Sequence, residues 1–117
     1  MLIDTHCHLD FTEFDQDREE TFKRAKEQGV EYFINIGSSI NGSKKSVELA
    51  NKYESLYASV GIHPHGADNI LSNAADVIRE LAKNKKVVAI GEIGLDYFKH
   101  FSEPENQRPL FKFSKII

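Results

Sequence analysis

The sequence predicts an α/β fold with a parallel sheet, and two observations support this prediction. Four short apolar runs have the pattern of strands, and a segment with the period of a helix follows each run. Strands that alternate with helices of this length are joined by right-handed crossovers into a parallel sheet. The 117 residues suit one domain, and the sequence contains no low-complexity stretch or long linker.

The predicted strands are short, and two of them are almost continuous in apolar residues. The runs Tyr32–Ile34 and Val87–Ile90 have the pattern of strands that are buried on both faces, as in a parallel sheet. The four predicted strands are Leu2–His6, Glu31–Ile36, Leu56–Ile62 and Lys86–Ile90, the last with an extension to Ile93.

The predicted helices follow from apolar residues at helical spacing and from residues that suit helix ends. Asp15 or Asp17 could cap the first helix, and Gly29 suits its C-terminus. The second helix is predicted over about residues 42–53, and the fourth from about Glu103, with Pro104 in its first turn. The apolar positions are Phe14, Phe22 and Ala25 in the first helix, Val47, Ala50 and Tyr53 in the second, Ile70, Leu71, Ala74, Val77, Ile78, Leu81 and Ala82 in the third, and Leu110, Phe111 and Phe113 in the fourth.

The composition excludes several classes of protein. With 40% hydrophobic and 28% charged residues, the chain is neither a disordered tail nor a collagen-like or coiled-coil rod. No apolar run approaches the ~20 residues that cross a bilayer, and no signal-peptide pattern opens the sequence. Together with the lone Cys7, this favours the cytoplasm and no membrane partner. The net charge of −3 argues against a general basic surface for nucleic acid, but not against a small positive site made by a metal.

The motif Asp4–Asp10, with the sequence Asp-Thr-His-Cys-His-Leu-Asp, ends the first predicted strand. Because side chains alternate along a strand, His6 and His8 face the same way and could bind one cation. Asp4 has the same parity and could orient a ligand histidine, whereas Cys7 faces away and packs as a small apolar residue. The alternative is that both histidines are solvent-facing loop residues.

Two further motifs end the third and fourth predicted strands. In Gly61–His65, Pro64 stops the strand, and His63 could donate to a phosphate or act in acid–base chemistry near neutral pH. The alternative, a turn histidine with no role, weighs more for His65. In Gly91–Tyr97, Glu92 follows an apolar strand between two glycines, where a bound cation would offset the cost of burying it.

The three motifs share one place in the predicted fold, the carboxyl ends of parallel strands, where β/α proteins build their sites. Two histidines and a carboxylate form a nitrogen and oxygen donor set that is compatible with zinc, manganese or magnesium, as one ion or two. Such a set suits metal-assisted hydrolysis of a phosphate or a carbonyl. Asp96 and Tyr97 follow in the next loop, where they could line the site or simply cap and pack.

These motifs resemble those of the TatD family of metal-dependent deoxyribonucleases, and the likeness extends from Met1 to about Phe111. It implies the (β/α) units of a TIM-barrel-type hydrolase with one or two divalent metal ions and DNA as substrate, often as a 3′–5′ exonuclease. It also implies that Glu92 can bridge two metals and that His63 lies near the scissile phosphate. The predicted metal ligands are His6, His8 and Glu92, the predicted catalytic residues are His63 and Glu92, and the predicted substrate-binding residues are His63, His65, Asp96 and Tyr97.

The sequence also departs from the family pattern, which continues with two ligand histidines and a ligand aspartate on later strands. An eight-stranded barrel takes ~250 residues, so we expect about four of the eight strands in one partial domain, residues 1–117, truncated in or near the fourth helix. Residues 113–117 fit either a truncated helix or an unrelated tail. We therefore expect weak or no nuclease activity, and self-association through the open edges of the half-barrel.

Two alternatives to a nuclease stay open at the level of the sequence. The same donor set could hydrolyse a small amide or lactone, because a fold does not determine a substrate. The chain could also be a half-barrel module without catalytic activity that pairs with a second copy. The glycine-flanked Glu92 favours the nuclease.

Overall fold

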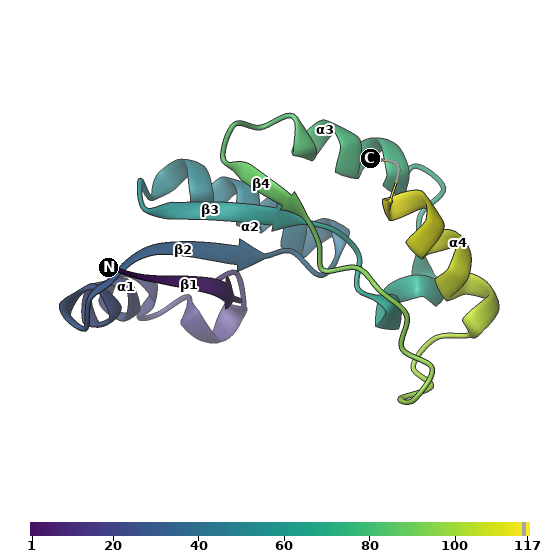
Figure 1. Ribbon diagram of the computed structural model, residues 1–117, viewed down its shortest axis with the longest axis horizontal. Helices are drawn as coiled ribbons and strands as arrows, with labels where there is room; N and C mark the ends of the chain where they lie inside the picture. The colour runs from purple at the N-terminus through teal and green to yellow at the C-terminus, as the bar shows by residue number, and fades with distance from the viewer. Residues whose placement is uncertain (116) are drawn as a thin grey trace.

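The computed structural model describes residues 1–115 and 117 and contains a four-stranded parallel sheet (Figure 1). The strands pair in the order of the sequence, so each crossover joins two adjacent strands. The predicted parallel α/β fold is confirmed, and the strands begin and end within a few residues of the predicted bounds. They are β1 (Leu2–Cys7), β2 (Val30–Ile36), β3 (Leu56–Val60) and β4 (Val87–Ile90).

A helix follows each strand, and two short 3₁₀ helices extend the first and third connections. The α-helices are α1 (Arg18–Glu27), α2 (Ile40–Lys52), α3 (Ala74–Ala82) and α4 (Pro104–Ser114), and the 3₁₀ helices are η1 (Thr12–Phe14) and η2 (Pro64–Asn69). Within residues 1–115 and 117, none of these helices is both long and apolar enough to cross a membrane. The alternatives for the tail concern residues 113–117, of which Ile116 lies outside the described residues.

The helix ends confirm part of the sequence-based expectation and correct the rest. Gly29 follows α1 with φ +89°, the left-handed conformation expected after a helix. Asp17 precedes α1 without forming a side-chain cap, and the Asp15 carboxylate instead accepts a bond from Arg18. Helix α2 begins two residues earlier than predicted, because the Ser39 hydroxyl accepts the backbone N–H of residue 42.

The start of the third helix was predicted wrongly. Ile70 and Leu71 continue its apolar spacing, yet α3 begins only at Ala74. Pro64 opens η2, and Ile70 at the end of η2 is extended, so the backbone cannot enter α3 there. Leu71 consequently lies in the connection, where 64% of it is exposed.

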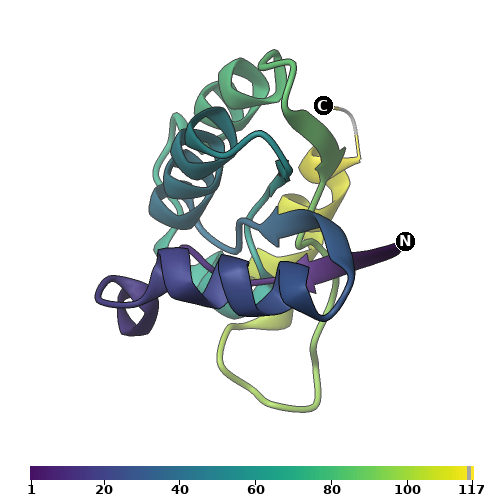
Figure 2. The same cartoon turned by 90° about the vertical axis from the view of Figure 1, so that its left-hand side faces the viewer.

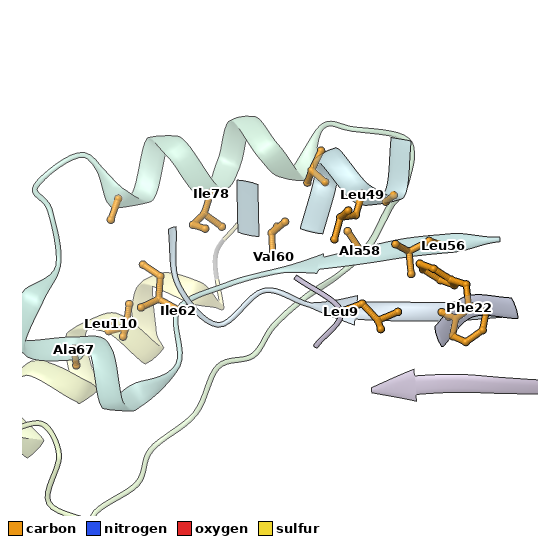
Figure 3. Close-up of a cluster of buried hydrophobic side chains, with 14 residues drawn as sticks. Leu9, Phe22, Leu49, Leu56, Ala58, Val60, Ile62, Ala67, Ile78 and Leu110 are labelled. Carbon is orange, nitrogen blue, oxygen red and sulfur yellow. The ribbon is translucent and has the colours of Figure 1, made fainter. Parts of the chain in front are cut away.

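One face of the sheet carries the hydrophobic core. Helices α1, α2 and α3 pack along this face, whereas α4 packs against η2 (Figures 1 and 2). Alternate residues of β3 point into the core and are fully buried, namely Leu56, Ala58 and Val60 (Figure 3). The core continues to Leu110 of α4, so all four β/α units contribute to it.

The other face of the sheet is open, which corrects the prediction that the apolar strands are buried on both faces. Tyr32 on β2 is 41% exposed, and Val88 on β4 is 52% exposed. The rings of Tyr32 and Tyr57 lie beside each other on this face, with centroids 6.3 Å apart. The described helices cover only the opposite face, so these apolar residues keep contact with solvent.

Candidate metal centre

The carboxyl ends of the strands bring two of the predicted motifs into one cluster. His6 lies on β1, His8 directly follows it, and Glu92 follows β4; one donor atom from each lies within 4.8 Å of the others. Since β1 and β4 are the outermost strands, a flat sheet would separate them by roughly 14 Å. The sheet therefore curls so that its two edges converge at their carboxyl ends.

Backbone bonds from the two middle strands hold Glu92 in place. Its N–H donates to the carbonyl of Gly37 at 2.9 Å, directly after β2. The preceding residue, Gly91, donates to the carbonyl of Val60 at 2.9 Å and accepts the Ser59 hydroxyl at 2.7 Å. The carboxylate thus extends from a backbone segment that β2 and β3 both position.

Gly61 makes this close packing possible. A Cβ atom at this position would lie 2.6 Å from the carbonyl carbon of Gly91, which is closer than atoms can approach. The buried Ser43 hydroxyl of α2 donates to the Gly61 carbonyl and accepts its N–H, both at 3.0 Å. Ser43 and Ser59 were missed by sequence reasoning. The available signal was that Ser43 lies four residues before Val47, on the buried side of α2.

Hydrogen bonding to the backbone leaves a ring nitrogen of His8 free for a metal. Its Nδ1 lies 3.1 Å from the carbonyl of Ile36, and a carbonyl only accepts, so Nδ1 carries the proton. The neutral ring then has an unprotonated Nε2, which is the form that binds a metal. The ring also stacks on Phe11, with centroids 4.9 Å apart.

His6 completes the cluster from the more exposed side. Its Nε2 lies 3.9 Å from a carboxylate oxygen of Glu92, and its ring meets the ring of His8 edge-on at 5.1 Å. Asp4, which could orient a ligand histidine, bonds to His6 through the backbone: its carboxylate accepts the His6 N–H at 3.1 Å. Asp4 therefore orders the strand end rather than the imidazole.

The donor set fits a divalent cation. Two imidazoles and one carboxylate offer nitrogen and oxygen ligands, as zinc and manganese sites do, and they converge from two separate strands. Cys7, by contrast, lies away from the cluster. Its thiol donates to the Ile34 carbonyl at 3.3 Å, and burial raises its pKa to about 12, so it packs as predicted and does not act as a ligand.

His63 lies beside the cluster and presents a proton to it. Its Nδ1 accepts the backbone N–H of His65 at 3.1 Å, so the neutral ring carries its proton on Nε2. This Nε2 lies 3.7 Å from a carboxylate oxygen of Glu92. Burial lowers the pKa of His63, and the nearby Glu92 charge opposes this only in part, so the ring is neutral near pH 7.

The other predicted substrate-binding residues lie one layer further out. His65 and Asp96 bind each other, with Nε2 2.5 Å from a carboxylate oxygen, and this bond lowers the pKa of Asp96. The buried amide of Gln107 accepts the N–H of Asp96 at 2.7 Å and donates to its carbonyl at 2.9 Å. The neighbouring Tyr97 is partly exposed, and its hydroxyl accepts a hydrogen bond from Arg108 Nε at 3.2 Å.

A parallel β/α sheet that gathers two histidines and a glutamate at its carboxyl edge defines the barrel-type metal-dependent hydrolases. The chain belongs to one family of this class, the TatD-related DNases, whose family model matches residues 3–114. The resemblance inferred from the three motifs is thereby confirmed.

Individual relatives agree with this assignment. The chain is 38% identical over 112 residues to the uncharacterized metal-dependent hydrolase YabD of Bacillus subtilis, covering 96% of this chain and 44% of that protein. It is 36% identical over 110 residues to the 3′-5′ ssDNA/RNA exonuclease TatD of Cronobacter sakazakii, covering 94% of this chain and 42% of that protein. The chain thus spans less than half the length of these relatives.

Solved structures show the same fold. The crystal structure of YjjV, a TatD homolog from Escherichia coli, matches with a TM-score of 0.88 at 34% identity, over 97% of this chain and 44% of that one. A TatD family hydrolase from Entamoeba histolytica matches with a TM-score of 0.89 at 28% identity, over 98% of this chain and 44% of that one. The four β/α units therefore have the arrangement of one part of a TatD-type TIM barrel.

Proposed function

We propose that this chain carries the metal-binding part of a nuclease that hydrolyses phosphodiester bonds in single-stranded DNA or a similar nucleic acid. The observation that supports this most directly is the convergence of His6, His8 and Glu92 within 4.8 Å, with the protonated nitrogen of His63 beside them. The similarity to 3′-5′ ssDNA/RNA exonucleases named TatD supports the choice of substrate.

Each residue has a distinct role in this proposal. His6, His8 and Glu92 would hold a divalent cation, magnesium, manganese or zinc, as one ion or two. When bound, the cation would polarise the phosphate as a Lewis acid and activate water. His63 donates a hydrogen bond from its Nε2–H to a phosphate oxygen, a role that the neutral ring performs without losing its proton. His65 and Asp96 position His63 and the following loop, and Tyr97 borders the substrate.

We expect weak metal binding and little or no hydrolysis by the chain alone. The described residues supply three donors in the cluster, and the chain covers 44% of YabD and 42% of the Cronobacter exonuclease. A solvent-facing three-donor site binds a divalent cation less tightly than a complete one. The cytoplasm stays our prediction for its location, because the lone Cys7 needs no oxidising compartment.

Calorimetric titration with Mn²⁺ and cleavage of a labelled single-stranded oligonucleotide test the proposal together. Glu92→Gln should abolish Mn²⁺ binding and any cleavage, whereas Glu80→Gln, on the exposed side of α3, should change neither. Equal Mn²⁺ affinity in both variants would refute the metal centre. Hydrolysis of a lactone or cyclic amide in place of the oligonucleotide would refute the nuclease.

We also propose that the open face of the sheet pairs with a second copy of the chain. Tyr32 and Val88 leave apolar surface exposed on this face, and β1 and β4 each lack a neighbour on one side among the described strands. Sedimentation over a range of concentrations should show a dimer that Val88→Lys dissociates. A monomer at every concentration would refute this pairing.

A further inference from the structure

The loop between β4 and α4 displays aromatic rings to solvent. Its segment 97–101, with the sequence Tyr-Phe-Lys-His-Phe, is called the ring loop below. Phe98 is 84% exposed and Phe101 is 64% exposed, and Tyr97 is also exposed. Large apolar side chains gathered on one short surface segment indicate an interaction site more often than isolated ones do.

Buried polar residues anchor the ring loop at both ends. The Gln107 amide donates to the carbonyl of Asp96 at 2.9 Å and to that of Ser102 at 2.7 Å. The buried Ser102 hydroxyl in turn donates to the carbonyl of His65 at 2.7 Å. These bonds fix the residues on either side of the loop. Its rings therefore face solvent from an anchored segment of chain.

A chain of ring contacts connects the ring loop to the metal centre. Phe101 packs edge-on against His65, with centroids 4.7 Å apart, and His65 packs in the same way against His63 at 4.2 Å. His63 Nε2 lies 3.7 Å from the Glu92 carboxylate. A molecule lying on Phe101 therefore continues toward the cluster along a surface lined by rings.

Cations accompany the rings, although the whole chain has a net charge of −3. Lys99 Nζ lies 5.7 Å from the centroid of the Phe98 ring, and the Arg108 guanidinium lies 5.8 Å from that of Tyr97. The negative charge of Glu105, which lies near Arg108, offsets part of this positive charge. Alternating rings and cations fit a ligand that has both flat faces and negative charge.

We propose that the ring loop is a stacking platform for the bases of a single nucleic-acid strand whose backbone extends to the metal centre. The proposal rests on the proposed function for the class of substrate. Exposed rings with nearby cations form the surface on which single-stranded nucleic acids bind, because bases stack on the rings and phosphates meet the cations. A nucleic-acid strand fits the ring loop better than a protein partner does, since a purely apolar protein surface would leave Lys99 without a counter-charge.

Fluorescence anisotropy tests the proposal in metal-free buffer, with a labelled oligothymidylate and an abasic strand of the same length as probes. Phe98→Ala should weaken oligothymidylate binding about tenfold, the loss expected for one stacked base, and leave the abasic strand unaffected. Phe98→Trp should restore the binding. Leu71→Ala, an exposed apolar residue outside the loop, is the matched control and should bind both strands as the parent chain does.

Three results would overturn the proposal: no binding of oligothymidylate, equal losses with both strands, or unchanged binding accompanied by loss of a dimer in Phe98→Ala. The last result would identify a second copy of the chain as the occupant. Because Phe98 is largely exposed, its variants should keep the melting temperature of the parent chain. Failure of the metal-centre proposal is a separate outcome, seen as absent Mn²⁺ binding, or as Mn²⁺ binding that Glu92→Gln leaves unchanged, while ring-dependent binding of the oligothymidylate persists.

Discussion

On β2, Phe33 and Tyr32 are neighbours in sequence but point to opposite faces of the sheet, and they meet different surroundings. Phe33 is buried under α1, where its ring meets the ring of Phe22 edge-on at 5.0 Å. Tyr32 lies 41% exposed beside Tyr57 on the open face. The comparison teaches that apolar character alone does not reveal where stability resides. The helix-covered face stabilises the chain, and the open face is available for another surface.

The largest expected effect comes from removing a core side chain on the covered face. Leu56→Ala should lower the free energy of unfolding by about 3 kcal/mol, because a fully buried leucine leaves a cavity that neighbours fill poorly. Val88→Ala, on the open face, should cost less than about 1 kcal/mol. Denaturant unfolding measures both. Equal costs would break the comparison and show that the open face is packed.

Overpacking at the carboxyl edge should have the next largest effect. Gly61→Ala forces a methyl group against Gly91 and should cost about 2 kcal/mol, while displacing Glu92 and weakening Mn²⁺ binding. Gly66→Ala is the matched control, since its new Cβ would lie no closer than 3.6 Å to Ile62. If Gly61→Ala bound Mn²⁺ like the parent chain, the close approach would have no role in positioning the carboxylate.

A buried hydroxyl links the covered face to the metal centre. Ser43→Ala leaves the N–H and carbonyl of Gly61 without this partner and should lower the free energy of unfolding by about 1–2 kcal/mol. Ser72→Ala, at an exposed position before α3, should have almost no effect. Thermal unfolding of the two variants measures the difference, and equal melting temperatures would contradict the role assigned to Ser43.

The smallest expected effect concerns Asp96, in the loop between β4 and α4, and the pH dependence of unfolding. Because the bond from His65 lowers the pKa of Asp96, this carboxylate stabilises the fold above the ordinary aspartate pKa of 3.8, and the contribution is lost as the pH falls through the lowered value. Asp96→Asn should therefore remove a small part of the acid sensitivity of unfolding below roughly pH 4. Denaturant midpoints at several pH values measure it, and an unchanged profile would show that the His65 bond contributes nothing.

The predictable part of the fold was the part that local pattern determines. The four strands were predicted because each apolar run is bounded by helical segments or glycines. The start of α3 was missed because the chain forms η2 first, which leaves Ile70 and Leu71 in the connection between η2 and α3. The apolar spacing of these two residues does not reveal that Pro64 starts a separate helix before them. Exposure of Tyr32 and Val88 was also missed, because an apolar run does not reveal whether one face or two are covered.

The candidate site was predictable in its members but not in its supports. Parity along β1 and the common edge of parallel strands were enough to bring His6, His8 and Glu92 together. The bonds that hold Glu92 and Gly61 come from residues of other β/α units, and only the register of the sheet brings those residues close. The roles assigned to the ligands and to His63 stay predictions that the experiments above test.

The order of the strands gives the placement of the cluster a thermodynamic consequence. Each strand pairs only with its neighbour in sequence, so the four β/α units resemble a short linear array in which cooperativity passes from one unit to the next. The cluster joins the first unit to the last, since His8 and Glu92 come from the two ends of this array. A cation bound there would join the two ends of this array and close a long loop of chain. Local unfolding of β1 would then be coupled to local unfolding of β4.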